Sequence, residues 1–104
     1  MEHYSIVLTN SAKIDLRRNI NYIKNILCEP QIAERTMSAI ESAIKRLEEM
    51  PCQYPLVADE LLAELGFHRM IVNNCVIFFT IDEEVKIVYI ERIRHMRQDW
   101  GNLI

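Results

Sequence analysis

Apolar positions follow two different periods along this chain, and the change of period divides it into segments. Residues 4–9, YSIVLT, alternate apolar and polar positions, which predicts a strand. Three further apolar runs predict strands over residues 67–72, 75–81 and 85–93. The run at 75–81 is apolar at nearly every position, as is typical of a central strand buried on both faces. Asn73-Asn74 predicts a tight hairpin turn before this run, because Asn tolerates positive φ.

Between the first strand and the other three, apolar residues recur at spacings of three and four. This period predicts one amphipathic helix over residues 11–27 and a second from Pro30 to Pro51. The link between them is so short that the two helices must form an antiparallel hairpin. Residues 51–66 form a connection in which 59–65 could make a helical turn. We therefore expect the helical hairpin to cover one sheet face and leave the other to water or a ligand.

Composition and charge narrow the class of protein. The chain has 104 residues, half of them apolar, which suits one domain with a two-layer core. We see no signal peptide and no apolar run long enough to span a membrane. Three cysteines without CxxC spacing predict reduced thiols in a cytoplasm. The net charge of −3 is unusual for a generic nucleic-acid binder, although the segment from Arg92 to Arg97 holds three Arg and no acid.

The candidate chemistry lies near the end of the chain. Glycine-rich phosphate loops, nucleophile elbows and metal-ligand spacings are absent, so we expect no cofactor and no metal. The side chains that remain are Arg69, Arg92, Arg94, His95, Arg97 and Trp100. Metal-free RNA cleavage needs a base, an acid and cations beside the phosphate, and His and Arg can supply these functions. Trp100 could stack on a base.

Each of these residues also has a structural interpretation. Arginines at strand ends commonly pair with acids such as Glu91 or Asp99, and a lone His is more often a hydrogen-bonded surface residue. A single Trp in a short tail often covers the edge of a core. Alternation places Arg92 and Arg94 on one face of their strand, but whether Arg69 shares that face depends on strand register. The sequence leaves this register open.

Four segments taken in order resemble the RelE/ParE superfamily of toxins from bacterial type II toxin–antitoxin modules. They are LTNSAKIDL, MPCQYPLV, VNNCVIFFTIDEE and RIRHMRQDW, and the resemblance runs from Tyr4 to the C-terminus. It implies one domain over residues 1–104 with an α+β fold of order β-α-α-β-β-β. In that fold the helical hairpin packs on one face of a mostly antiparallel four-stranded sheet.

The resemblance also implies a cytoplasmic toxin that inhibits growth until a cognate antitoxin neutralises it, as a homodimer or a toxin–antitoxin heteromer. ParE-like members bind and poison DNA gyrase, whereas RelE-like members cut mRNA on the ribosome. A third alternative is a degenerate, inactive member. If the chain is a ribonuclease, the catalytic residues are expected to be His95, Arg97 and Arg69. The residues expected to contact the target are Arg69, Arg92, Arg94, Arg97 and Trp100.

One departure from the RelE pattern favours the gyrase alternative. RelE-like ribonucleases usually carry an Arg at the start of the central strand, in a pattern like N-Y-R-V-I-Y. Here the stretch reads NCVIF, and Val76 stands where that Arg would be. Arg97 keeps the C-terminal basic position, and His95 lies where some members place a catalytic His. The missing cation and the acidic balance lead us to expect a ParE-like toxin.

Overall fold

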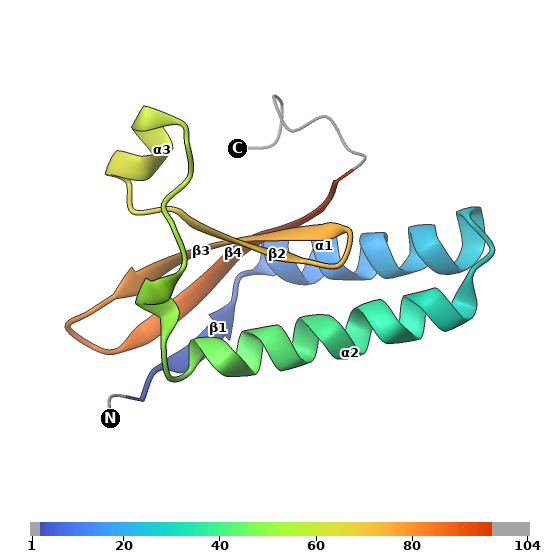
Figure 1. Cartoon of the computed structure of the whole chain (residues 1–104), viewed down its shortest axis with the longest axis horizontal. Coiled ribbons are helices and arrows are strands. Elements are labelled where there is room, and N and C mark those ends of the chain that lie inside the picture. The colour runs from blue at the N-terminus through green and yellow to red at the C-terminus, as the bar shows by residue number, and fades with distance from the viewer. Residues whose placement is uncertain (1–2, 97–104) are drawn as a thin grey trace.

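The computed structural model describes residues 3–96 (Figure 1). Its elements are β1 (Ser5–Leu8), α1 (Asn10–Asn21), the π-helical turn η1 (Tyr22–Ile26), α2 (Pro30–Leu47), the 3-10 turn η2 (Pro51–Gln53), α3 (Glu60–Glu64), β2 (His68–Val72), β3 (Cys75–Asp82) and β4 (Ile87–His95). The strands form one sheet in the order β1-β4-β3-β2. β2, β3 and β4 are an antiparallel meander, and β1 pairs parallel to β4. The predicted α+β fold with a mostly antiparallel sheet is confirmed.

The main core lies between the sheet and the helical hairpin. In Figure 1, α1 and α2 run side by side in opposite directions, and α3 lies on the other side of the strands from α2. The strands turn alternate side chains toward the hairpin, which is the direction of the buried residues Met70, Val72, Ile77, Phe79, Val88, Ile90 and Ile93. The helices contribute Ala12, Ile40, Ala43 and Leu47. This layer is the one that the two helical periods predicted.

The second sheet face is less open than we expected. A smaller cluster on that face contains the buried residues Val57, Val76 and Phe78. The connection before β2 packs Leu62, Ala63 and Phe67 against it. Within the connection, α3 begins where the Asp59 side chain accepts a hydrogen bond from the Leu62 amide at 3.0 Å. The 51–66 connection therefore covers part of the face that was predicted to be left to water or a ligand.

The last strand is displaced from its predicted position. β4 spans Ile87–His95, two residues later than predicted, because residues 83–86 are needed for the turn. The Asp82 carboxylate accepts hydrogen bonds from the amides of Glu84 and Val85, and Lys86 adopts a φ of 55°. Arg94 and His95, which lie beyond the predicted strand 85–93, are consequently strand residues. Their side chains must then point to opposite faces of the sheet.

α1 occupies the edge of β4 beyond the end of β1. Strand β1 pairs with β4 only as far as Leu8, opposite Ile90. Thr9 then caps α1 by accepting from the Ala12 amide at 3.1 Å, while its hydroxyl donates to the Glu91 carbonyl at 3.0 Å. Further along the helix, side chains of α1 hydrogen-bond to the next backbone groups of β4. The backbone groups at this edge of β4 therefore hydrogen-bond to side chains of a helix and its cap instead of to a neighbouring strand.

Candidate functional site

Strand register places all three described arginines of the predicted site on one sheet face, the face away from the helical hairpin. Arg69 lies opposite Phe78, and Phe78 lies opposite Arg92 on the next strand. Residues that oppose one another across a sheet point to the same side. Arg94, two residues beyond Arg92, lies opposite Val76. Arg69 therefore shares its face with Arg92 and Arg94, but Phe78 stands between the first two.

Arg69 is the exposed cation of this set. It belongs to β2, which forms one edge of the sheet, and its backbone amide donates to the Pro55 carbonyl at 3.0 Å. That bond fixes the strand while the side chain stays in solvent. The exposed Ile71 follows it on the same face, so the surroundings of Arg69 are partly apolar. An arginine in this setting can contact a phosphate or the carboxylate of a protein partner.

Arg92 and Arg94 are held by one buried carboxylate, Asp15 of α1. The Nε and Nη2 of Arg92 donate to the two Asp15 oxygens at 2.7 and 3.0 Å, and the Nη1 of Arg94 donates at 3.1 Å. The Ile93 amide donates to the same carboxylate at 3.1 Å. Asp15 is only 3% exposed, whereas the side chains of Arg92 and Arg94 are 27% and 14% exposed. Both guanidiniums therefore extend from the sheet face away from the helical hairpin, around the β4 edge, to reach Asp15 on α1.

The electrostatics of this cluster favour its charged form. Burial raises the pKa of Asp15, but hydrogen bonds from Arg92 and Ile93 and the charges of both arginines outweigh it, so the pKa lies below its ordinary value. The Asp15 hydrogen bond in turn raises the pKa of Arg92. Asp15 thus stays ionised at neutral pH and offsets positive charge that the sequence assigned to target binding.

His95 lies on the other face of the sheet from Arg92 and Arg94. It is 3% exposed and opposes the buried Cys75 in the register of β3 and β4. Its ring packs edge-on against Tyr22 of η1, with the ring centroids 5.7 Å apart. A catalytic base must reach the proton that it removes. In this conformation the imidazole is separated from the three arginines by the sheet itself.

Val76 occupies the position of the arginine that RelE-like patterns carry. It is fully buried on the sheet face away from the helical hairpin, between Ile71 and Arg94 in the strand register. Its isopropyl group belongs to the small apolar cluster with Phe78 and Val57. The centre of this face is therefore aliphatic and aromatic. Arg97 and Trp100, which were also predicted to contact the target, lie outside the described residues.

Sequence reasoning missed Asp15, the residue that organises the described site. A signal was present, because Asp15 and Asn19 stand four residues apart within the buried stripe of α1. The Asn19 side-chain amide donates to the Ile93 carbonyl at 2.8 Å, so both polar residues bind the β4 backbone. A polar residue on the core-facing side of a helix is the informative observation, since buried charges are usually paired.

Other site types find no support within the described part of the chain. Residues 3–96 contain no group of three His, Cys, Asp or Glu side chains that could hold a metal ion. None of the helices in that range is long and apolar enough to cross a membrane. The site is therefore described by its arginines, their carboxylate and the apolar centre between them.

Comparisons with known proteins allow the family of this chain to be assigned. A search of curated proteins gives no significant match. A chain of the RelBE2 toxin–antitoxin complex from Mycobacterium tuberculosis is similar in structure, with a TM-score of 0.63, 22% identity and coverage of 89% of this chain and 98% of that one. A chain of the chromosomal ParDE toxin–antitoxin system from P. aeruginosa gives a TM-score of 0.71, 20% identity and coverage of 91% and 98%.

These solved structures support the fold, and a family model extends the similarity to the sequence. The model for the ParE toxin of the type II toxin–antitoxin system parDE matches residues 6–100, which is nearly the whole chain. The order of elements, the parallel pairing of β1 with β4 and the helical hairpin agree with this assignment. The chain belongs to the ParE toxin family of type II toxin–antitoxin systems.

Proposed function

We propose that this toxin arrests growth by binding DNA gyrase and that it does not itself cleave RNA. The observation that carries the proposal is the engagement of Arg92 and Arg94 by Asp15. Cleavage of a phosphodiester needs cations that stabilise charge developing on the phosphate. Two of the candidate cations already share a carboxylate, and a valine stands at the position of a third. The described face offers little positive charge for that purpose.

The position of His95 supports the same proposal. A general acid or base has to come within hydrogen-bond distance of the reacting oxygen, directly or through one water. His95 is buried against Tyr22 on the far side of the sheet from the arginines. An RNA substrate bound across the sheet face that carries the arginines would therefore not contact this imidazole. We infer that His95 has a packing role in this chain.

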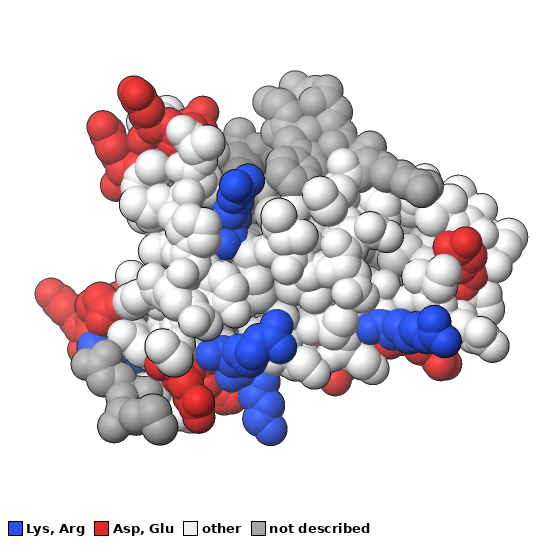
Figure 2. Space-filling view, viewed as in Figure 1, with Lys and Arg blue, Asp and Glu red and all other residues white. Residues whose placement is uncertain are grey.

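Surface charge also favours a protein target over an RNA target. Affinity for nucleic acid depends on the number of phosphates that Lys and Arg neutralise. This chain has a net charge of −3. In the view of Figure 2, basic side chains form separate groups with uncharged surface between them, so that they make no continuous basic track there. Exposed apolar side chains such as Ile71 and Leu65 suit a protein interface better.

Ribosome-dependent mRNA cleavage is the second candidate, and one observation favours it. Arg69 is exposed and shares its face with Arg92, so a phosphate bound there would meet at least one available guanidinium. This candidate requires Arg92 or Arg94 to exchange Asp15 for a phosphate. It also requires a proton acceptor other than His95, or a movement that exposes His95.

We further propose that a cognate antitoxin neutralises the toxin as a heteromeric complex in the bacterial cytoplasm. Both solved neighbours come from toxin–antitoxin complexes, and the family model describes a toxin of that kind. The complex would be tested by co-expressing the toxin with its antitoxin and measuring growth. Restored growth together with a stable complex in size-exclusion chromatography is the expected result.

The choice of target can be tested by pulse labelling after induction of the toxin without its antitoxin. We expect thymidine incorporation to fall before methionine incorporation, and the purified toxin to inhibit gyrase supercoiling. Arg69→Glu should weaken both effects, while Arg46→Glu, an equal charge change on the exposed side of α2, should not. If methionine incorporation falls first, the gyrase proposal is wrong. If neither falls and growth continues, the chain is an inactive family member.

A further inference from the structure

The two edges of the sheet differ in how they are protected. At the β2 edge, the Arg69 amide donates to the Pro55 carbonyl, and the connection before β2 pairs Leu56 with His68. Arg69 also places a charge on that strand. Along the β1 edge, Ser5–Leu8, the strand has no charged residue, and within residues 3–96 no segment pairs with its outer side. A strand edge without such protection is suited to pairing with another chain.

The hydrogen bonds of β1 show which of its backbone groups point outward. The amides of Ser5 and Thr9 donate to carbonyls of β4 at 2.9 and 3.1 Å. Backbone groups of alternate residues point to opposite edges of a strand, so those of Ile6 and Leu8 point away from β4. The side chains of Ile6 and Leu8 pack against the main core. Val7 therefore points to the other sheet face, where it is 40% exposed.

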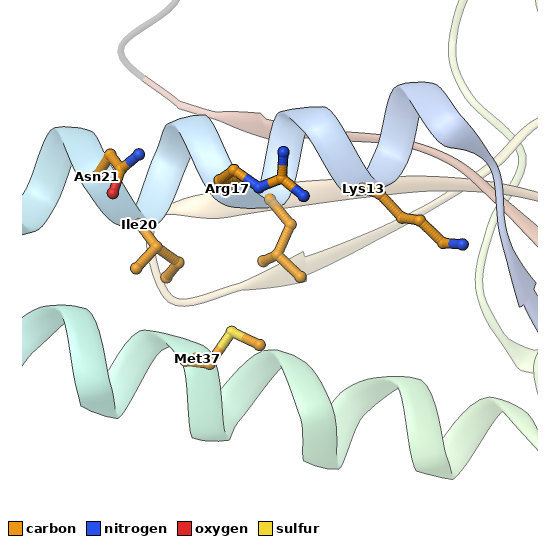
Figure 3. Close-up of a pocket in the computed structure, with 6 residues that line it drawn as sticks. Lys13, Arg17, Ile20, Asn21 and Met37 are labelled. Atoms are coloured by element: carbon orange, nitrogen blue, oxygen red, sulfur yellow. The ribbon is translucent and has the colours of Figure 1, made fainter.

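A pocket of about 440 Å³, which we call the β1 groove, lies between this edge and the C-terminal half of α2. In Figure 3, Met37 of α2 points toward Ile20 of α1, so α1 lies against this side of α2. Glu41 and Ile44 follow on the same side of α2, and there β1 lies beside the helix instead. The groove is lined by His3, Tyr4, Ser5, Ile6, Glu41, Ile44, Lys45 and Glu48.

The charges along the β1 groove are mixed in sign. Glu41 and Glu48 are acidic and Lys45 is basic, and within residues 3–96 none of the three forms an ion pair. The next exposed charges on α2, Arg46 and Glu49, are again one of each sign. A partner of a single charge sign would be repelled by part of this surface. A second copy of the chain carries the same mixture, so its acids can face Lys45.

We propose that the β1 edge pairs with the β1 edge of a second copy of this chain, which forms a two-fold symmetric toxin dimer. In antiparallel pairing, Ile6 of one copy lies opposite Leu8 of the other, and the two residues exchange both backbone hydrogen bonds. Two-fold symmetry repeats this pair and joins the two four-stranded sheets into one. Val7 lies at the symmetry axis and faces its own counterpart.

Side chains add to this pairing on both faces of the joined sheet. On the side of the helical hairpin, Leu8 of the second copy lies opposite Ile6 and beside the half-buried Ile44 of the β1 groove. On the other side, the two Val7 side chains cover one another, as cross-strand neighbours do. β1 has only four residues, so these contacts supplement a short run of backbone hydrogen bonds. Arg69, at the opposite edge of the sheet, stays accessible to a target.

Sedimentation of the purified toxin over about 1–200 µM tests the proposal. We expect the mass to rise with concentration from the 12.3 kDa of one chain to twice that value. The amides of Ile6 and Leu8 should become protected from hydrogen exchange over the same range. A toxin that stays monomeric would overturn the proposal. Protection of these two amides by the antitoxin alone would assign the edge to the antitoxin and overturn it equally.

Charges introduced at the symmetry axis distinguish this surface from others. Val7→Lys and Val7→Glu each place two like charges opposite one another, so each should weaken dimerisation roughly tenfold or more. An equimolar mixture of the two variants should recover the dimer, because a lysine then faces a glutamate. Leu61→Lys adds one charge at an exposed apolar position of α3 and should dimerise like the wild type. A dimer that persists in Val7→Lys, or a mixture that stays monomeric, would overturn the proposal.

Two adjacent residues of α2 provide a matched pair for the β1 groove. Lys45 lines the groove, whereas Arg46 does not. Lys45→Glu should weaken dimerisation about tenfold, since each exposed pair contributes modestly, symmetry applies the change twice and reversal adds repulsion. Arg46→Glu makes the same charge change and should leave dimerisation unaltered. Equal weakening by the two variants would overturn the placement of the second copy over the groove.

The outcome is independent of the toxin's target. Sedimentation contains neither gyrase nor ribosomes, so a monomeric toxin would reject the dimer and leave the labelling experiment unaffected. Conversely, an early fall in methionine incorporation would reject the gyrase proposal and leave the sedimentation result valid. The two failures can therefore be told apart.

Discussion

Asp15→Asn would remove one negative charge from the centre of the β4 edge while keeping the size of the side chain. The wild-type carboxylate binds Arg92, Arg94 and the Ile93 amide. Asparagine can still accept from the Ile93 amide, but it provides no charge for two guanidiniums. We expect a large loss in the free energy of unfolding.

The size of the loss follows from burial. Removing one member of a buried ion pair costs about 3–5 kcal/mol, because the remaining charge is left without its partner. The side chains of Arg92 and Arg94 are 27% and 14% exposed, so both keep some hydration. We therefore expect the lower end, about 3 kcal/mol. In a domain of this size that corresponds to a fall in Tm of roughly 12–20 °C.

Urea unfolding followed by far-UV circular dichroism would measure the effect. Glu41→Gln is the control, because it removes one charge at an exposed position of α2 that has no ion-pair partner within the described residues. It should change the free energy of unfolding by less than about 0.5 kcal/mol. If Asp15→Asn costs no more than this control, the cluster is not the strong interaction that its distances and burial indicate.

Asp15→Asn should also change how the free energy of unfolding depends on pH. Because the folded-state pKa of Asp15 lies below its ordinary value of 3.8, its contribution is present above that value and is lost as the pH falls through the folded pKa. The wild type should therefore lose stability in acid more steeply than Asp15→Asn. Parallel acid profiles of the two proteins would contradict the assignment of a lowered pKa to Asp15.

Three further predictions address the surroundings of this cluster. Asn19→Ala should lower the free energy of unfolding by about 1–3 kcal/mol, measured in urea, because it leaves the buried Ile93 carbonyl unpaired. Thr9→Ala removes the cap of α1 and a hydrogen bond to β4, and should cost about 1–2 kcal/mol in the same assay. Burial raises the pKa of Cys75 to about 11, so a thiol reagent should modify the two exposed cysteines in the native protein and reach Cys75 only after unfolding. Rapid modification of all three thiols would contradict this.

The fold could be predicted from the sequence because side-chain periods follow from backbone geometry. A period of two over residues 4–9 and periods near 3.6 over the helices admit few other interpretations. The start of β4 was predicted two residues early. Its turn depends on the Asp82 carboxylate and on the positive φ of Lys86, and a run of acidic residues indicates a turn without showing its length.

The site was harder to predict, because its contacts join residues far apart in the chain. Asp15 and Arg92 are separated by 77 positions, and helical periodicity gives the face of Asp15 but not its partner. The error in the predicted bounds of β4 also prevented a prediction of the sheet face on which His95 lies. A strand that reaches residue 95 places His95 and Arg94 on opposite faces, whereas a tail after Ile93 allows them to act together.

The short length of β1 explains why Asp15 contacts the β4 edge, and it suggests a last test. Since β1 ends at Leu8, the later part of the β4 edge needs other partners, and Asp15 supplies one with a charge. That charge is paired with Arg92 and Arg94 and offsets part of their positive charge. Asp15→Asn keeps the acceptor for the edge amide and removes the negative charge that Arg92 and Arg94 share, so the folded variant should bind immobilised heparin at a higher salt concentration than the wild type. The gain should exceed that of Glu41→Gln, which changes net charge equally. Equal elution of these two variants would mean that Asp15 does not control the availability of the arginines.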